Sequence, residues 1–265
     1  MNTESYAPDS RRLRVAQTLA LPLALVVVWQ FWAMTLPAGS PAPAPLKVIQ
    51  SFVTLVTTGG LFNATVQSLG RVLLGFAAAS LVGVTLGVLM GSSRTVRENL
   101  DPIVESFRPI APMAILPIAI LWLGTGTPTA LAIVAYAAFF PVLINTMHGV
   151  SRVDRKLVLA ARTMGVPPLT ILTRVVLPGA LRSILLGSRL AMGVAWTAII
   201  AAELAVGAKS GEGGSGGIGQ MMFVFYAYSI DLNAIVVCMI VVGVVALLID
   251  RLFRSLEHRL IPWSH

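Results

Sequence analysis

Residues 72–91 read VLLGFAAASLVGVTLGVLMG, a run without a single charged side chain. About 20 mostly apolar residues are needed for one helix to cross the hydrocarbon core of a bilayer. The rest of the chain has the same character, because 56% of its 265 residues are hydrophobic, only 11% are charged, and the mean hydropathy is +0.84. Soluble domains carry about 25% charged residues. This composition therefore indicates an integral membrane protein.

Five more segments are apolar enough to be predicted as membrane spans, on either side of the first one. They are residues 15–36, 109–123, 128–150, 183–206 and 232–249. We therefore expect an all-α fold with six transmembrane helices and both termini in the cytoplasm. Residues 1–265 would form a single transmembrane domain, in which residues 151–180 are the longest cytoplasmic loop.

Residues 48–70 are uncharged and raise the alternative of a seventh span. Their apolar positions, from Leu46 through Ile49 and Val53 to Val56, recur at helical spacing, which favours a helix lying along the membrane interface. With six spans, only Lys47, Arg71 and Lys209 among the 19 Lys and Arg residues lie outside. A seventh span would reverse this distribution, so the positive-inside rule favours six.

The N-terminal apolar run is expected to be retained as a helix. Ser10-Arg11-Arg12 faintly resembles a twin-arginine signal, but residues 15–36 are longer than the usual signal-peptide core of about 7–15 residues.

Several kinds of site are excluded by residue counts and motifs. One cysteine, Cys238, allows no internal disulfide, and the three histidines are not at metal-ligand spacing. No G-x-x-x-x-G-K-[ST] nucleotide motif occurs, and the G-x-G-x-x-G of residues 211–216 follows an apolar helix rather than a strand. The net charge is +8, but the basic residues lie between the apolar runs. This placement is typical of residues that set membrane topology rather than of a nucleic-acid-binding face. We expect no catalytic residue, no metal and no cofactor bound by this chain.

The long inner loop carries the most specific pattern. Leu157 to Met164 is predicted to form a short helix, Gly165 to end it in a left-handed conformation, and Pro167 and Pro168 to prevent its continuation. A second short helix is expected to run toward Pro178. The alternative is an ordinary amphipathic loop that packs on its own bundle.

This loop resembles the EAA coupling loop of ABC-importer permeases, whose pattern is E-A-A, three residues, Gly, nine residues and I-x-L-P. Val175 stands where isoleucine is usual, and leucine replaces the usual glutamate at position 159. The resemblance implies that a separate ATPase subunit docks on this loop. The docking residues would be Leu157, Leu159, Ala160, Ala161, Met164, Gly165, Leu177 and Pro178.

Segments near residues 107–124, 195–204, 217–219 and 259–263 are similar to the nitrate, sulfonate, taurine and bicarbonate branch of these permeases. This resemblance implies a type I importer architecture in the bacterial cytoplasmic (inner) membrane. It also implies a homodimer, a periplasmic or lipid-anchored substrate-binding protein, and ATP and Mg²⁺ held by the partner ATPase. The solute would be a small anion such as nitrate, a sulfonate or taurine.

Residues inside the spans are candidates for the translocation pathway or for gating. Pro109, Pro112 and Pro117 predict a broken helix beside a cavity, or else a kinked packing helix. The intramembrane Glu203 is expected to make a structural hydrogen bond or to take part in gating. Asn145, Trp196 and Thr197 either face the pathway or pack between helices.

A different class of protein remains as an alternative, namely a proton-coupled secondary transporter with Glu203 and His148 as its relay. A membrane scaffold without transport activity is a third hypothesis, which leaves the spacing of the coupling loop unexplained.

Overall fold

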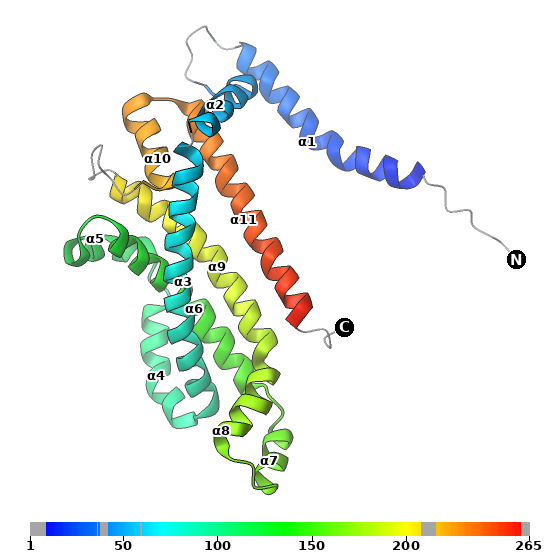
Figure 1. Ribbon diagram of the computed structural model, residues 1–265, viewed down its shortest axis with the longest axis vertical. Helices are drawn as coiled ribbons and strands as arrows, with labels where there is room; N and C mark the ends of the chain where they lie inside the picture. The colour runs from blue at the N-terminus through cyan, green and yellow to red at the C-terminus, as the bar shows by residue number, and fades with distance from the viewer. Residues whose placement is uncertain (1–8, 36, 38–41, 59, 208–215, 261–265) are drawn as a thin grey trace, which may run out of the picture.

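The computed structural model describes residues 9–35, 37, 42–58, 60–207 and 216–260, and no strand occurs in this part of the chain (Figure 1). The predicted all-helical class is confirmed. The helices, in chain order, are α1 (Asp9–Thr35), α2 (Pro45–Thr57), α3 (Gly60–Ser92), α4 (Arg94–Phe107), α5 (Pro112–Leu123), α6 (Thr127–Ser151), α7 (Arg155–Thr163), α8 (Pro168–Ile171), the π-helix η1 (Leu172–Val176), α9 (Leu177–Gly207), α10 (Ile218–Val224), the π-helix η3 (Phe225–Ser229) and α11 (Leu232–Leu260).

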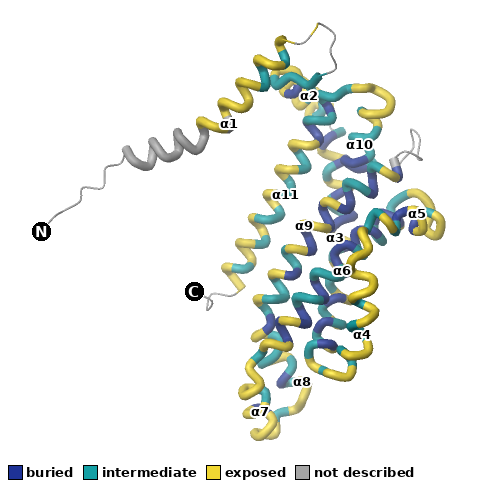
Figure 2. The backbone as a smooth tube through the Cα atoms, turned by 180° about the vertical axis from the view of Figure 1, so that it is seen from behind, coloured by how far each residue is buried: buried dark blue, intermediate teal, exposed yellow. Residues whose placement is uncertain are grey.

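The long helices α3, α6, α9 and α11 form a bundle, with α7 and α8 at one end and α2 and α10 at the other (Figure 1). The buried residues concentrate on α3, α6 and α9 (Figure 2). The first helix, α1, packs on α2 and leads away from the bundle, and the apolar side chains described in its second half are largely exposed. We call the α7 end the lower end and the α10 end the upper end.

Small residues at every fourth position of α3 allow α6 to approach its backbone. A Cβ atom added to Gly87 would lie 2.7 Å from Cβ of Thr146, and one added to Gly91 would lie 2.6 Å from Cβ of Val150. Gly75 and Gly83 meet Val134 and Val142 in the same way. Helices in membranes associate through such close contacts between small residues, because lipid provides no hydrophobic driving force.

A second set of small residues brings α9 against the other face of α6. A Cβ atom on Gly149 would lie 2.5 Å from Cβ of Ser183, and one on Gly187 would lie 2.5 Å from Cβ of Asn145. The α6 helix is therefore in close contact with neighbouring helices on two sides. Half of the residues in its most apolar segment are buried.

The spans differ from the sequence prediction in length and in one case in shape. Within the described residues, α3, α6, Pro168–Val206 and α11 are each long and apolar enough to cross a membrane. The predicted span at residues 109–123 corresponds to α5, which has only 12 residues and is joined to α4 by a 91° bend, so the two helices form a broken span or a re-entrant loop. At 1.5 Å per residue, α5 is roughly 18 Å long, too short for a 30 Å hydrocarbon core. The six-span count remains a prediction.

The second short helix expected before Pro178 does not end there. Instead α8, η1 and α9 follow one another without a break, and Pro178 is the second residue of α9. The N–H of Leu177 bonds to the carbonyl of Leu172, five residues earlier, so a π-helical turn directly precedes the proline. A wider turn at this place accommodates a residue that lacks an N–H donor.

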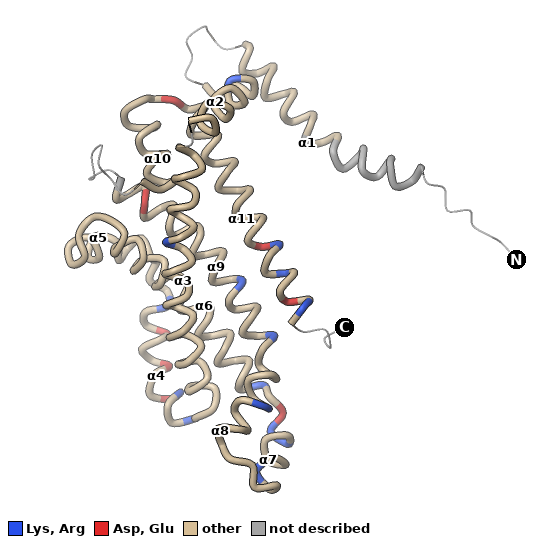
Figure 3. Tube along the Cα trace, in the orientation of Figure 1, with Lys and Arg blue, Asp and Glu red and all other residues tan. Residues whose placement is uncertain are grey.

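The helix predicted before residue 57 is confirmed as α2, and its position along a membrane surface remains a prediction. Lys and Arg residues gather toward the lower end of the bundle (Figure 3). Two arginines, however, are misplaced by the sequence analysis. Arg71, counted outside, is buried within α3, and Arg108, counted on the inner side, lies at the upper end of α4, roughly 20 Å from Arg94. Lys209 and most of the irregular loop at residues 207–219 lie outside the described residues.

The close contact between α3 and α6 leads to a stability prediction. Gly87→Val is expected to destabilise the chain by about 1–3 kcal/mol, because the new side chain overlaps Thr146 and the carbonyl of Leu143. Thermal unfolding of the purified protein in detergent would measure this loss. Gly243→Ala on α11, where a Cβ atom meets nothing within 4 Å, is the matched control and should not lower the midpoint. Equal midpoints for both variants would contradict the packing argument.

Candidate functional site

The α7 helix is capped at both ends by local hydrogen bonds. The side chain of Asp154 accepts a hydrogen bond from the N–H of Lys156 at the N-terminus. At the C-terminus, Gly165 has a φ of +73°. Its N–H donates to the carbonyl of Arg162, and the N–H of Val166 donates to the carbonyl of Ala161. These two bonds form a Schellman motif. The left-handed conformation predicted for Gly165 is confirmed.

The lower end of the protein presents apolar side chains that the rest of the chain leaves uncovered. Leu157 is 58% exposed, Met164 74% and Leu169 72%, and Ala160 is exposed between the first two on the same helical face. Ala161 instead is buried, so it packs inside the loop rather than on this face. We call Leu157, Ala160, Met164 and Leu169 the lower apolar surface.

The remaining predicted docking residues border this surface. Leu159, at the position where the coupling-loop pattern has glutamate, is 52% exposed and lines a cavity of about 750 Å³ between α7 and the lower ends of α3 and α4. Pro178 is exposed and Leu177 is half-buried at the start of α9.

A cleft of about 370 Å³ lies where the α4–α5 bend meets α6 and α9. The hydroxyl of Tyr136 on α6 donates to the carbonyls of Phe107 (2.7 Å) and Ile110 (3.3 Å), which holds the bend against α6. Pro112 begins α5 and lines the cleft. Pro109 lies in the bend and Pro117 within α5, and neither lines the cleft.

The other pathway candidates separate into two groups. Asn145 lines the cleft, while its amide nitrogen donates to the carbonyl of Pro141. Thr197 is exposed on α9, one turn beyond the cleft residue Val194, and its hydroxyl donates to the carbonyl of that residue. Trp196 instead is buried, and its ring N–H donates to the carbonyl of Val242, so it joins α9 to α11.

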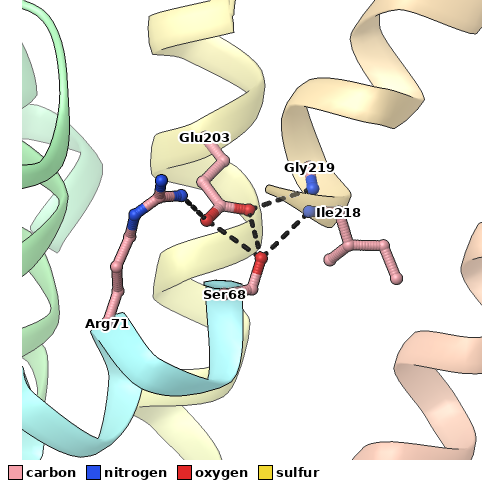
Figure 4. A network of polar contacts seen from close by, with 5 residues as sticks. All are labelled: Ser68, Arg71, Glu203, Ile218 and Gly219. Atoms are coloured by element: carbon pink, nitrogen blue, oxygen red, sulfur yellow. Dashed lines mark hydrogen bonds and ion pairs between the residues drawn. The ribbon is translucent and has the colours of Figure 1, made fainter. Parts of the chain in front are cut away.

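Glu203 is the centre of a buried polar network near the upper end of the bundle (Figure 4). The guanidinium of Arg71 on α3 lies 2.6 Å from one carboxylate oxygen. The hydroxyl of Ser68 lies 2.9 and 2.7 Å from the two oxygens, and the N–H of Gly219 donates to the second one at 3.0 Å. The same Ser68 oxygen accepts the N–H of Ile218 at 2.9 Å.

This network fixes the start of α10 against α3 and α9. A side chain at position 217 would collide with the Glu203 carboxylate, and a Cβ atom on Gly219 would lie 2.5 Å from the carbonyl of Ile200. Glycine at both positions therefore permits the backbone to approach the buried carboxylate. Buried charges are tolerated when they are paired and hydrogen-bonded in this way.

Ser68 and Arg71 are partners of Glu203 that the sequence analysis missed. Arg71 was counted as an outer residue because it precedes a charge-free run. Its partner, Glu203, is 132 positions away in the sequence, so no local pattern reveals the pair. A carboxylate inside a predicted span is itself a signal, because it requires a cation or several donors nearby.

Glu203 and His148 lie toward opposite ends of the bundle. His148 is one turn from the lower end of α6, where Gly149 contacts Ser183, and Glu203 is 20 residues further along α9, roughly 30 Å away. A direct proton relay between the two residues is not supported by this distance.

Comparison with known proteins agrees with the features described so far. Residues 79–262 match the family described as "Binding-protein-dependent transport system inner membrane component". The taurine transport system permease protein TauC of Escherichia coli is 36% identical over 97% of this chain and 92% of its own length. The nitrate import permease protein NrtB of Synechocystis is 33% identical over 98% and 94%. An inward-facing structure of the MetNI methionine ABC transporter superposes with a TM-score of 0.63 at 18% identity, covering 77% of this chain and 97% of the matched chain.

The chain therefore belongs to the family of inner-membrane permease components of binding-protein-dependent ABC transporters. It is a multi-pass membrane permease subunit of an ABC importer and not an enzyme, since the ATPase of these systems is a separate subunit. The predicted membership of the ABC-importer permease family is confirmed, while the assignment of the coupling loop itself remains a prediction.

The buried ion pair leads to a second stability prediction. Arg71→Met is expected to cost about 3–5 kcal/mol, because it leaves the Glu203 carboxylate buried without a cation. The double variant Arg71→Met/Glu203→Met should recover much of this loss, which a double-mutant cycle of unfolding midpoints would show. As a control, Arg94→Met breaks the exposed pair with Glu98 and should leave the midpoint unchanged. Additive effects of the two buried substitutions would contradict the pairing argument.

Proposed function

We propose that two copies of this chain form the translocation pathway of an ATP-driven importer for a small anion, such as nitrate, a sulfonate or taurine. A periplasmic or lipid-anchored substrate-binding protein would deliver the solute to the upper end. One observation carries the proposal: the capped α7 helix presents the exposed lower apolar surface. This surface lies at the end of the bundle where basic residues gather (Figure 3).

The lower apolar surface is the proposed docking site for the ATPase. The exposed leucine and methionine side chains would insert into a groove of the partner, and exposed Ala160 would let the partner approach the helix backbone. Leu159 would replace a charged contact by an apolar one. ATP and Mg²⁺ would be bound by the partner, where hydrolysis occurs.

Movement of the docked loop would be transmitted to the upper end through one helical segment. The helical segment Pro168–Val206 begins next to α7 and continues to the buried Glu203 network. Its 39 residues span roughly 58 Å, more than the thickness of the bilayer core. Closure of two ATPases would therefore move both ends of α9 together as a rigid body and alternate access to the pathway.

A homodimer is proposed because the cleft lies open along one face of α9. Leu186, Leu190 and Val194 recur every fourth residue and are 42–51% exposed beside it. A second copy, related by a two-fold axis, would cover this stripe with its own equivalent stripe and close the cleft into a cavity.

The choice of solute follows from the relatives and from the cleft. The two permeases compared above are named for taurine, which carries a sulfonate, and for nitrate. The cleft is the right size for such small solutes and has few polar groups on an apolar wall, as in most small-molecule sites.

The docking assignment is tested at the end of α7. Gly165→Pro forces φ to about −65° and removes the N–H that bonds to Arg162, so it should abolish coupled uptake. Gly165→Asn, which tolerates a left-handed conformation, is the matched control and should retain most of the activity. Uptake would be measured in proteoliposomes that contain the chain, its Walker-motif ATPase and the binding protein. Normal uptake by Gly165→Pro, or uptake by the wild type without ATP, would contradict the proposal.

A role for Glu203 in holding the upper end, rather than in contacting the solute, has its own test. Glu203→Gln removes the charge but keeps a side chain of the same shape beside Ser68 and Gly219. We expect the rate of uptake to fall while the preference among competing anions stays the same. A changed preference in competition assays would show that the carboxylate faces the solute.

A further inference from the structure

Arg108 lies at mid-depth of the bundle. It is the residue that follows α4, in the bend that Tyr136 holds through the carbonyls of Phe107 and Ile110. Tyr136 is nine residues from the first residue of α6 and fifteen from its last, or roughly 14 and 22 Å along the axis. Because α6 is long and apolar enough to cross a membrane, this bend lies far from either end of the span.

The charge of Arg108 is not neutralised by the described part of the chain. The other arginines of α4 have carboxylate partners, since Arg94 pairs with Glu98 and Arg97 with Asp101. No described carboxylate lies within ion-pair distance of Arg108, and none lines the cleft that it borders. Glu105, one turn earlier on α4, is exposed to the surroundings and makes no ion pair with a described cation.

Such a position is unusual for a cation. An arginine at membrane depth is costly unless it faces a water-filled cavity or a partner of opposite charge. Arg71 satisfies this condition because it pairs with Glu203. Arg108 has no described carboxylate partner and borders only the cleft. The missing counter-charge is therefore expected to come from a ligand in the cleft.

The surroundings of Arg108 suit an anion. Arg108 is exposed and borders the cleft wall formed by Phe140, Leu190 and Val194, so its guanidinium is accessible to a solute that enters the cleft. Pro112, the first residue of α5, also lines the cleft, which places the positive end of that helix dipole at the same wall. The planar guanidinium donates two parallel hydrogen bonds to nitrate, carboxylate or sulfonate oxygens.

We propose that Arg108, together with the first turn of α5, is the anion-binding site of the translocation cleft, and that it selects oxyanions with at least two accessible oxygens. This inference rests on the proposed import of a small anion and names the residue that would hold it in transit. The bend between α4 and α5 then has a function, because it holds the cation at the edge of the cleft that α6 and α9 also line.

Anion binding is tested directly on the purified full chain, without the ATPase. Thermal unfolding midpoints would be measured with nitrate, bicarbonate, taurine and ethanesulfonate, at ionic strength matched with chloride. At least one of these should raise the midpoint of the wild type, and the rise should disappear in Arg108→Gln. Arg251→Gln, an exposed arginine of α11 outside the cleft, is the matched control and should respond as the wild type does. Equal responses of wild type and Arg108→Gln to every anion would overturn the inference.

Transport by the reconstituted complex separates this inference from the proposed function. Uptake of the stabilising anion by Arg108→Gln should fall at least about tenfold, and Arg108→Lys should retain an intermediate rate because it keeps the charge but loses the planar fork. Uptake by Arg108→Gln within twofold of the wild type would overturn the anion site while leaving the importer intact. Absence of ATP-dependent uptake by the wild type would instead overturn the proposed function, and the unfolding experiment would still decide on Arg108.

Discussion

The backbones of α3, α6 and α9 lie so close together that several of their contacts leave no room for a Cβ atom, and the rest of the bundle depends on this packing. Gly87 and Gly91 face α6 from one side, and Gly149 and Gly187 mark its contact with α9. Because apolar surface gains nothing by leaving lipid, short-range packing has to hold these helices together. The three helices then form a rigid frame on which both the loop at the lower end and the network at the upper end are fixed.

The charges of Arg71 and Arg108 are accommodated in different ways. Arg71 has a complete set of partners, since its guanidinium meets a carboxylate that also accepts hydrogen bonds from Ser68 and Gly219. That arrangement joins three segments of the chain and is a structural element. Arg108 lies beside a cleft without a carboxylate, which is an arrangement suited to a passing ligand. For the proposed import of an anion, the first arrangement would hold the upper end together and the second would bind the solute in transit.

The proposed long-range coupling in this subunit depends on one continuous helical segment. The π-helical turn at Leu172–Val176 allows Pro178 to be accommodated without a break, so that the helix which begins beside α7 reaches Glu203. A broken helix at Pro178 would separate the proposed docking loop from the upper network. The α4–α5 pair makes the opposite use of proline, because Pro109 and Pro112 end one helix and begin another across a 91° bend.

Composition and local pattern by themselves determined that this is a helical membrane protein, roughly where its long apolar helices lie, and that α7 stops at a left-handed glycine. These features depend on the apolar content of short windows and on the conformational freedom of one residue, which are properties of the local chain. Only the tertiary structure decided that residues 109–123 are not a straight span, that Ala161 faces inward, and that Arg71 pairs with Glu203 across 132 positions. It also placed Arg108 beside Tyr136 at mid-depth rather than at the inner surface. Hydropathy and charge rules treat each segment alone, whereas the bend of a helix pair and the partner of a buried charge depend on which helices pack together.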